Sequence, residues 1–248
     1  MNLPGHSPSC RCSACDTDHG RHSRPLITIS DVSLRREDRQ ILDRVNLTVD
    51  HGDFIAITGP NGGGKTSLLR MILGLLRPTS GDIRFFNADG TAAPASPQFG
   101  YLPQKNSVDA HFPITVREVV ASALLSHRGM TADEKSLRIA QALQLIELED
   151  LADRPIGKLS GGQLQRALFG RAIVSRPPVL ILDEPLSYID KHFESHLYRI
   201  IADLAGSTTI MLVSHEMSEI AGMANRHVIV DRTLHECTAA HHYVRGEC

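Results

Sequence analysis

The chain has 248 residues, of which 42% are hydrophobic, and its formal net charge is −2. This length suits one large domain with an ordinary apolar core. The near-neutral charge gives no electrostatic support for binding to DNA or RNA, so we expect no nucleic-acid partner. No run approaches the roughly 18 apolar residues of a membrane span. The N-terminus also lacks the apolar stretch of a secretory signal, and we expect a soluble, intracellular protein.

The first 25 residues are polar, and we interpret residues 1–25 as a flexible tail before the folded domain. They contain three cysteines and three histidines, of which five lie at close spacing: Cys10, Cys12, Cys15, His19 and His22. Thiolates and imidazoles are the ligands of tetrahedral zinc and copper(I) sites, so this tail is a candidate Zn²⁺ site. The alternative is a polar tail that is rich in cysteine and histidine without binding a metal, and the sequence leaves both open.

The domain is expected to begin near residue 26, with strands over 26–49 joined by a charged turn at 35–40. A short apolar run at 54–57 predicts the next strand, and 67–76 has the apolar spacing of a helix that stops before Pro78. Between the strand and the helix the chain reads GPNGGGKT, which fits the pattern GxxxxGK[ST]. A strand before this pattern and a helix after it are the context in which it binds phosphates.

The glycine-rich loop predicts the binding of a phosphate chain. Its backbone N–H groups can turn inward, and the helix N-terminus adds a partial positive charge. We expect Lys65 to reach the terminal phosphates, Thr66 to hold Mg²⁺ through its hydroxyl, and Ser67 to be a neighbouring phosphate contact. The predicted binding residues in this region are Gly59, Pro60, Asn61, Gly62, Gly63, Gly64, Lys65, Thr66 and Ser67.

Further along the chain, 88–98 reads as a surface loop and 116–151 has helical apolar spacing. The prolines at 177 and 178 end the helix before the next strand. The apolar run 179–182 predicts a strand buried on both faces, as in a parallel sheet covered by helices. A third such strand is predicted at 209–213.

Two carboxylates, Asp183 and Glu184, follow the buried strand 179–182 directly. Open α/β sheets bind ligands outside the carboxyl ends of their strands, so we expect both side chains beside the phosphate loop. We assign Mg²⁺ anchoring to Asp183. Glu184 is assigned the orientation and deprotonation of an attacking water, which is a general-base role.

With the motif LSGGQ at 159–163 added, the chain resembles the ATP-binding subunits of ABC transporters over residues 26–235. The resemblance implies an α/β fold, a P-loop nucleotide-binding domain with an antiparallel β layer and a helical subdomain at about 105–165. It also implies ATP hydrolysis by a head-to-tail homodimer. In that dimer, the ATP held by one subunit faces four signature residues of the other: Ser160, Gly161, Gly162 and Gln163.

The same resemblance gives roles to three further residues. Gln104 matches the glutamine that senses magnesium and the attacking water, and His215 matches the switch histidine that contacts the γ-phosphate. Asp190 matches the aspartate that couples the two ATP sites. Many members of the family stack an aromatic ring on adenine, but here Arg36 occupies the matching place. A guanidinium plane can stack on a base, and an exposed hairpin arginine is the alternative.

The segment 112–120 resembles the zinc and manganese importer branch, where FPITV borders the surface that receives the permease. Related siderophore importers have a similar sequence in this segment. The same residues also predict a simple helix entry, with Thr115 as the cap and Val116, Val119 and Val120 as the buried face. Near the C-terminus, His235 and Cys237 resemble a pair found in zinc-importer ATPases, and residues 236–248 read as a short second tail.

We therefore expect a Mg-ATP-dependent subunit that energises import of zinc or manganese from the cytoplasmic face of the plasma membrane. Its expected partners are a second copy, an integral membrane permease and a substrate-binding protein. Three alternatives stay open: an importer ATPase for siderophore or haem, a soluble ABC ATPase without a transport role, and a metal sensor or store suggested by the tails.

Overall fold

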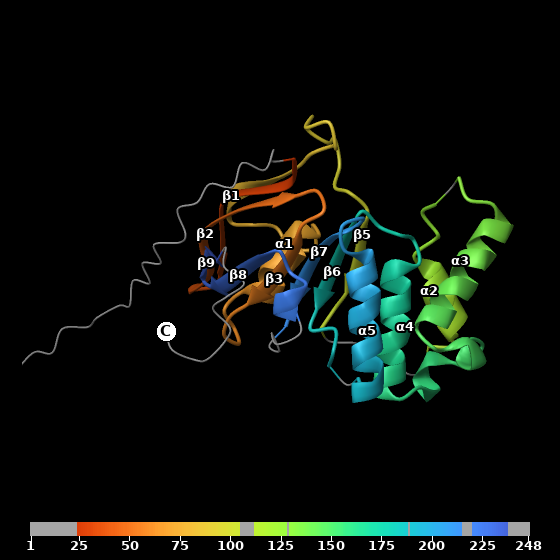
Figure 1. Ribbon diagram of the computed structural model, residues 1–248. Helices are drawn as coiled ribbons and strands as arrows, with labels where there is room; N and C mark the ends of the chain where they lie inside the picture. Colours follow the sequence, from red (N-terminus) through yellow and green to blue (C-terminus); the bar gives the residue numbers. More distant parts are fainter. Residues whose placement is uncertain (1–23, 105–111, 128, 188, 215–219, 238–248) are drawn as a thin grey trace, which may run out of the picture.

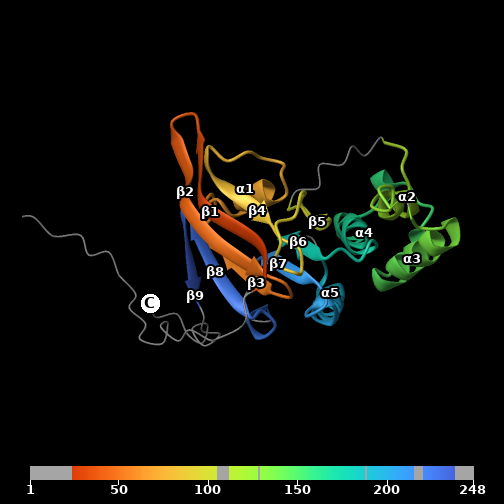
Figure 2. The same cartoon turned by 90° about the horizontal axis from the view of Figure 1, so that it is seen from above.

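The computed structural model describes residues 24–104, 112–127, 129–187, 189–214 and 220–237. Two parts lie side by side, with β layers around helix α1 (Lys65–Ile72) on one side and a group of helices on the other (Figures 1 and 2). None of the helices within these ranges combines the length and the apolar character that crossing a bilayer requires.

Within the described residues, the central sheet has six strands in the order β5-β6-β7-β3-β8-β9. Neighbouring strands are parallel except for the antiparallel β8–β9 hairpin. Their bounds are Phe99–Leu102 for β5, Val179–Asp183 for β6, Thr209–Val213 for β7, Phe54–Thr58 for β3, Arg226–Asp231 for β8 and Thr233–Cys237 for β9.

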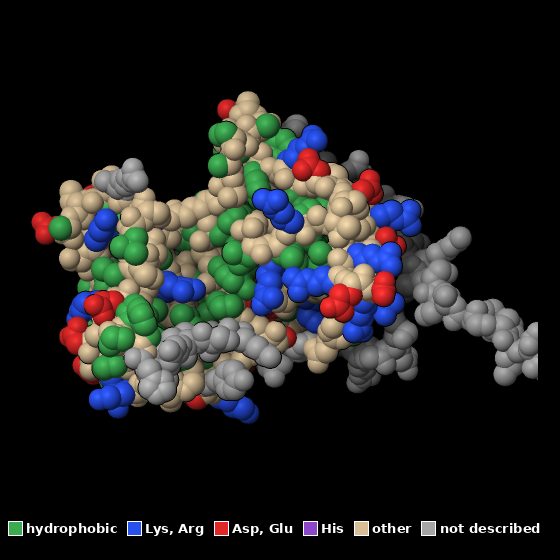
Figure 3. Space-filling model, turned by 180° about the vertical axis from the view of Figure 1, so that it is seen from behind, with side chains coloured by type: hydrophobic (Ala, Val, Ile, Leu, Met, Phe, Trp, Pro, Cys, Tyr) green, Lys and Arg blue, Asp and Glu red, His purple; other side chains and the backbone are tan. Residues whose placement is uncertain are grey.

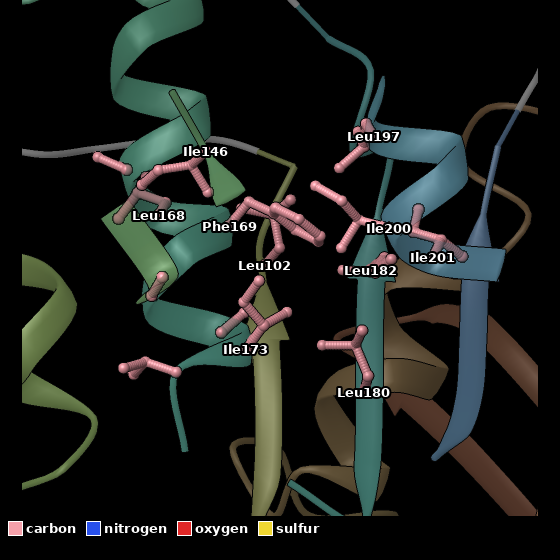
Figure 4. Close-up of a cluster of buried hydrophobic side chains, with 14 of the residues drawn as sticks. Leu102, Ile146, Leu168, Phe169, Ile173, Leu180, Leu182, Leu197, Ile200 and Ile201 are labelled. Atoms are coloured by element: carbon pink, nitrogen blue, oxygen red, sulfur yellow. The ribbon is translucent and has the colours of Figure 1, made fainter. Parts of the chain in front are cut away.

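The strands β3, β6 and β7 are buried along their whole length, which confirms the reading of their apolar runs. Alternate side chains of each strand point to opposite faces of the sheet. On β6, Leu180 and Leu182 face the helical side, where they meet Leu102 and Ile173 (Figure 4). Val179 and Ile181 pack in the core between the central sheet and the other β layer. One strand therefore joins two hydrophobic cores.

The second β layer is an antiparallel sheet in the order β2-β1-β4, with β1 at Pro25–Arg36, β2 at Arg39–Asp50 and β4 at Ser80–Phe85. The predicted strands over 26–49 and the charged turn between them are confirmed. Arg226 on β8 ties this layer to the central sheet. Its guanidinium donates to the Thr48 carbonyl on β2 and pairs with the carboxylates of Asp53 and Glu236.

Helix α1 lies earlier in the chain than the predicted 67–76, because glycines set both of its ends. Gly64 precedes the helix with a positive φ of 105°, and Gly74 follows it with a φ of 70°. A left-handed residue is readily supplied by glycine and does not continue a right-handed helix. The predicted surface loop at 88–98 is confirmed, since no helix or strand is assigned there.

The helical side contains α2 (Val116–Ser122), α3 (Ala132–Leu145), α4 (Gly161–Ile173) and α5 (Lys191–Leu204). As predicted, Thr115 caps α2, and Val116, Val119 and Val120 are buried. The cap is a capping box, in which the Thr115 side chain and Glu118 satisfy each other's backbone N–H groups. The predicted helical stretch 116–151 is divided into α2, α3 and a short 3₁₀ turn at Glu149–Leu151.

Candidate functional site

The loop between β3 and α1 is held tightly against the rest of the protein. Gly59 has a φ of 138°, and a Cβ atom at this position would overlap the carbonyl oxygen of Val230 on β8. The carbonyl of Gly63 accepts a hydrogen bond of 2.9 Å from the Arg232 amide. The loop is therefore fixed by its contacts with β8 and the β8–β9 turn, and glycine is required where the backbones approach.

Lys65 places a cation inside this loop. Lys65 is only 7% exposed, and its ammonium donates hydrogen bonds to the carbonyls of Gly59 at 2.7 Å and Pro60 at 3.0 Å. Backbone N–H groups, a helix N-terminus and a buried ammonium together form an anion-binding site. The predicted phosphate loop is thus present as a folded structure.

Two of the residues predicted to hold Mg²⁺, Thr66 and Asp183, lie next to the loop. The Thr66 hydroxyl donates to Asp183 Oδ2 at 2.9 Å, and Asp183 Oδ1 is buried with no hydrogen-bond partner in the structure. Burial raises the pKa of the Asp183 carboxyl, and the charge of Glu184 adds to this, whereas the Thr66 hydroxyl, Arg70 and Lys65 lower it. A buried carboxylate oxygen without a partner beside a hydroxyl fits a hard, oxygen-seeking cation such as Mg²⁺.

Glu184 stands at the carboxyl end of β6 in an unusual backbone conformation. Its φ is 54°, and its amide donates to the Val213 carbonyl on β7 at 2.9 Å. A non-glycine residue with such a φ costs on the order of 1–3 kcal/mol, and such residues cluster at functional sites. The position of Glu184 is therefore set by two neighbouring strands and not by a flexible loop.

These residues line one cavity of about 290 Å³. It brings together most of the predicted phosphate and catalytic positions from three separate parts of the sequence. The lining residues are Asn61, Gly62, Gly63, Gly64, Lys65, Thr66, Ser67, Gln104 and Glu184, together with Arg39 and Ile41. The cavity therefore combines residues predicted to bind phosphate, to hold Mg²⁺ and to act as a general base.

Arg39 and Ile41 were not predicted from the sequence. Arg36 and Arg39 are paired at the end of the β1–β2 hairpin, but only Arg39 lines the cavity. Arg39 and Ile41 are two residues apart on β2 and so share one side of the strand. The two-residue spacing can be seen in the sequence. Which side of β2 lines the cavity, however, depends on how the hairpin packs on the phosphate loop.

The signature residues lie at the start of α4 and are absent from the lining of this cavity. Ser160 is the N-cap of α4: its hydroxyl accepts from the Gln163 amide at 3.2 Å, and its own amide donates to Gln163 Oε1 at 3.0 Å. Asp190 caps α5 by accepting from the Phe193 amide at 3.0 Å, and this hydrogen bond lowers the pKa of the Asp190 carboxyl.

Several predicted residues lie outside the described part of the chain. They are His215 and the whole tail cluster of Cys10, Cys12, Cys15, His19 and His22. Cys237 is half-buried on β9. Across the ranges that the structure does describe, no three His, Cys, Asp or Glu side chains are grouped so as to hold a metal ion.

The family profile described as "ABC transporter" matches residues 42–187, more than half of the chain. The chain belongs to the ABC transporter family. A "Probable metal transport system ATP-binding protein" from Chlamydia trachomatis is 41% identical over 197 residues, 78% of this chain and 82% of that protein. The "Zinc uptake system ATP-binding protein ZurA" of Listeria innocua is 34% identical over 224 residues, 88% and 87% of the two chains.

Solved ABC structures have the same fold. The "Dimeric Structure of MJ0796, a Bacterial ABC Transporter Cassette" superposes with a TM-score of 0.74 at 25% identity, over 90% of this chain and all of that one. The predicted fold class and the predicted resemblance to ABC ATP-binding subunits are both confirmed. The chain is an ATP-binding subunit with ATPase activity.

Proposed function

We propose that this chain energises the import of a divalent metal ion, zinc or manganese, through a separate integral membrane permease. The observation that carries the proposal is the identity of 41% and 34%, over most of the chain, to proteins named for metal transport and zinc uptake. The cavity beside Lys65 is the site at which ATP would be bound and hydrolysed. A substrate-binding protein would complete the system, and residues 26–235 would form the ATPase domain.

The chemistry follows from the positions of the side chains. Lys65 and the loop amides bind the β- and γ-phosphates, while Thr66 and Asp183 would hold Mg²⁺, with Gln104 at the edge of the same cavity. When bound, Mg²⁺ neutralises charge on the phosphates. Glu184 orients the attacking water and accepts its proton, and His215 is assigned contact with the γ-phosphate.

Two copies of the chain are needed to complete each ATP site. No residue of 160–163 lines the cavity beside Lys65, and the dimeric bacterial cassette provides the precedent for pairing. The N-terminus of α4 carries the partial positive charge of a helix dipole, which suits a phosphate of the opposite subunit. In the proposed dimer, ATP lies between Lys65 of one chain and Ser160 of the other.

A surface between the two parts of the molecule suits the permease. Leu125, after α2, is 80% exposed and Phe112, before α2, is 58% exposed. Leu125 also lines a hollow of about 440 Å³ with Phe99 and Tyr101 of β5. Apolar side chains gather across the middle of the face in Figure 3. Exposed apolar surface marks protein–protein contact, so we place the ATPase peripherally at the cytoplasmic face of the plasma membrane.

The N-terminal tail is proposed to bind Zn²⁺ through Cys10, Cys12, Cys15, His19 and His22, because these side chains offer more than the four donors of a tetrahedral site. Zinc titration of the full chain tests this. A variant with serine at the three cysteines should bind less zinc, whereas equal binding by both proteins would dismiss the tail site.

Metal content and growth of a strain lacking this chain test the transport function. In chelated medium, zinc, manganese and iron are added back one at a time. We expect poor growth and low content of one metal, with rescue by zinc or by manganese. Rescue by iron alone would favour a siderophore or haem substrate. Unchanged growth and metal content in every condition would contradict metal import.

A further inference from the structure

Helix α4 contacts both ends of the segment that follows the catalytic carboxylate. Gln165 is fully buried, and its Nε2 donates to the carbonyl of Pro185 at 3.3 Å. The guanidinium carbon of the next residue, Arg166, lies 4.6 Å from the ring centroid of Phe193. Phe193 is the residue whose amide is held by Asp190. Two adjacent residues of α4 thus bracket residues 185–190.

The described residues of this segment, 185–187, 189 and 190, lie between β6 and α5 and make turn-type hydrogen bonds. The Ser187 amide donates to the Glu184 carbonyl at 3.2 Å, and the Ile189 amide donates to the Leu186 carbonyl at 3.1 Å. Part of the segment also lines a hollow of about 370 Å³ together with Glu184 and Ser214. The segment therefore has a packed side toward α4 and an open side, so its position depends on α4.

The Gln165 contact is specific and not simply apolar packing. A buried amide is costly unless it is hydrogen-bonded, and an apolar side chain would fill the same space more cheaply. Elsewhere on α4, Phe169 points toward Leu197 and Ile200 of α5, whereas Leu168 lies on the opposite side near Ile146 (Figure 4). The amide of Gln165 selects one position of the Pro185 carbonyl, one residue after Glu184.

Arg166 makes a second connection, to the helical side of the molecule. Its guanidinium pairs with Glu147, after the end of α3, at 3.4 Å while it covers the Phe193 ring. A cation over an aromatic face is favourable when both groups are partly desolvated, and Arg166 is only 16% exposed. Arg166 therefore contacts both the end of α3 and the start of α5.

We propose that Gln165 and Arg166 are positioning residues that couple the signature end of α4 to Glu184 and Asp190 of the same chain. This inference rests on the proposed dimer, in which the start of α4 meets the partner's ATP and Glu184 acts on the chain's own ATP. Because α4 is one continuous helix, a shift at Ser160 also moves Gln165. The two ATP sites are thus linked through this helix.

Steady-state ATPase kinetics of Gln165→Met and Arg166→Met test the proposal, with exposed Gln144→Met on α3 as the matched control. We expect the variants to bind ATP within about 2-fold of the wild type while kcat falls about 10- to 100-fold, the size of effect produced by a small misplacement of a catalytic group. The ATP dependence should become less cooperative. Arg166→Lys, which keeps a cation over Phe193, should recover part of the loss.

Hydrogen exchange supplies a readout that does not depend on turnover. With a non-hydrolysable ATP analogue, the Ser187 and Ile189 amides should become more protected in the wild type and less so in Gln165→Met. If Gln165→Met does not fold, the partly exposed Arg166→Met carries both tests. Wild-type kcat, cooperativity and protection in the folded variants would overturn the coupling. A wild-type chain without ATPase activity would instead overturn the proposed function.

Discussion

The hydroxyl of Thr66, in the first turn of α1, donates a hydrogen bond to Asp183 at the end of β6, across 117 positions of sequence. This contact joins the phosphate loop to the end of β6, and the other oxygen of the carboxylate, Asp183 Oδ1, is buried with no hydrogen-bond partner among the described residues. An oxygen in this state is costly unless a ligand satisfies it. The pair therefore suits the Mg²⁺ site that we propose for it.

Replacing Thr66 by valine should weaken the response to Mg²⁺. The change keeps the shape of the side chain and removes the hydroxyl that bonds Asp183. We expect the Mg²⁺ concentration for half-maximal ATPase activity to rise at least about 10-fold, and chelation of divalent cations to abolish activity in both proteins. Magnesium titrations measure this, with exposed Thr48→Val as the control. The same Mg²⁺ dependence in Thr66→Val and the wild type would remove the hydroxyl from the metal site.

Arg39 and Arg36 should differ in their effect on nucleotide affinity. Arg39 lines the cavity, whereas Arg36, its partner across the hairpin, does not. Cation–π stacking at an exposed site contributes about 0.5–1 kcal/mol, so Arg39→Ala should raise the Kd for ATP about 2- to 5-fold. Equilibrium binding of a fluorescent ATP analogue measures the difference. A larger effect of Arg36→Ala than of Arg39→Ala would assign base stacking to Arg36.

The buried ion pair between Asp53 and Arg226 should be important for stability. Asp53 is 5% exposed, and Asp53→Ala would leave the partly buried Arg226 charge with Glu236 as its remaining carboxylate partner, which places the expected loss near the lower end of the range for a broken buried pair. Breaking a buried pair on one side costs about 3–5 kcal/mol. Asp82→Ala, which removes an exposed aspartate from its pair with Arg84, is the matched control and should cost about 0–1 kcal/mol. Urea unfolding of both variants checks the contrast, and equal losses would refute it.

Acid should destabilise the fold in part through His227. Its ring shares a 2.8 Å hydrogen bond with Thr58, just before the phosphate loop, and burial lowers its pKa below the ordinary 6.5. Well above pH 6.5 the ring is neutral in the folded and the unfolded chain, so it does not make stability depend on pH. Below it, the unfolded chain takes up a proton that the folded chain resists, so stability falls as the pH falls toward the folded pKa.

His227→Gln should therefore show a flatter decline in unfolding free energy between about pH 7 and pH 5 than the wild type. Exposed His235→Gln is the control, and it should leave the wild-type slope unchanged. Urea titrations across this range measure both slopes. Parallel curves for His227→Gln and the wild type would show that the buried ring does not contribute to the acid response.

The sequence predicted those parts of the site that depend on short local motifs. Lys65 and Thr66 follow a glycine-rich loop, and Asp183 and Glu184 follow an apolar strand, so short patterns identify them and parallel-sheet geometry brings them together. Arg39 could not be identified in this way. Its place at the cavity depends on the register of the β1–β2 hairpin and on how that hairpin docks, and the sequence indicated Arg36 for this position instead.

The contact from Gln165 to Pro185 was also beyond sequence reasoning. A glutamine inside a helix usually lies at the surface, and no local pattern shows that this one is fully buried beside the turn after β6. The predicted ends of α1 differ from the observed ends for a related reason. Apolar spacing marks the face of a helix, but the backbone of Gly64 and Gly74 determines where it starts and stops.

Glu184→Gln isolates the catalytic carboxylate with almost no change of shape. If Glu184 is the general base, kcat should fall by a factor on the order of 10²–10⁴ while ATP remains bound, and the ATP-bound dimer should accumulate. Exposed Glu149→Gln should behave as the wild type. ATPase assays and size-exclusion chromatography with ATP check this, and a Glu184→Gln variant with undiminished turnover would exclude the assigned role.

The most direct test is uptake of radioactive zinc and manganese by a strain lacking this chain, complemented with either the wild type or Glu184→Gln at equal protein level. The account predicts that the wild type restores uptake of one of the two metals and that Glu184→Gln does not. Equal uptake with both forms, or uptake that is independent of the chain, would contradict the claim that ATP hydrolysis at Glu184 drives metal import.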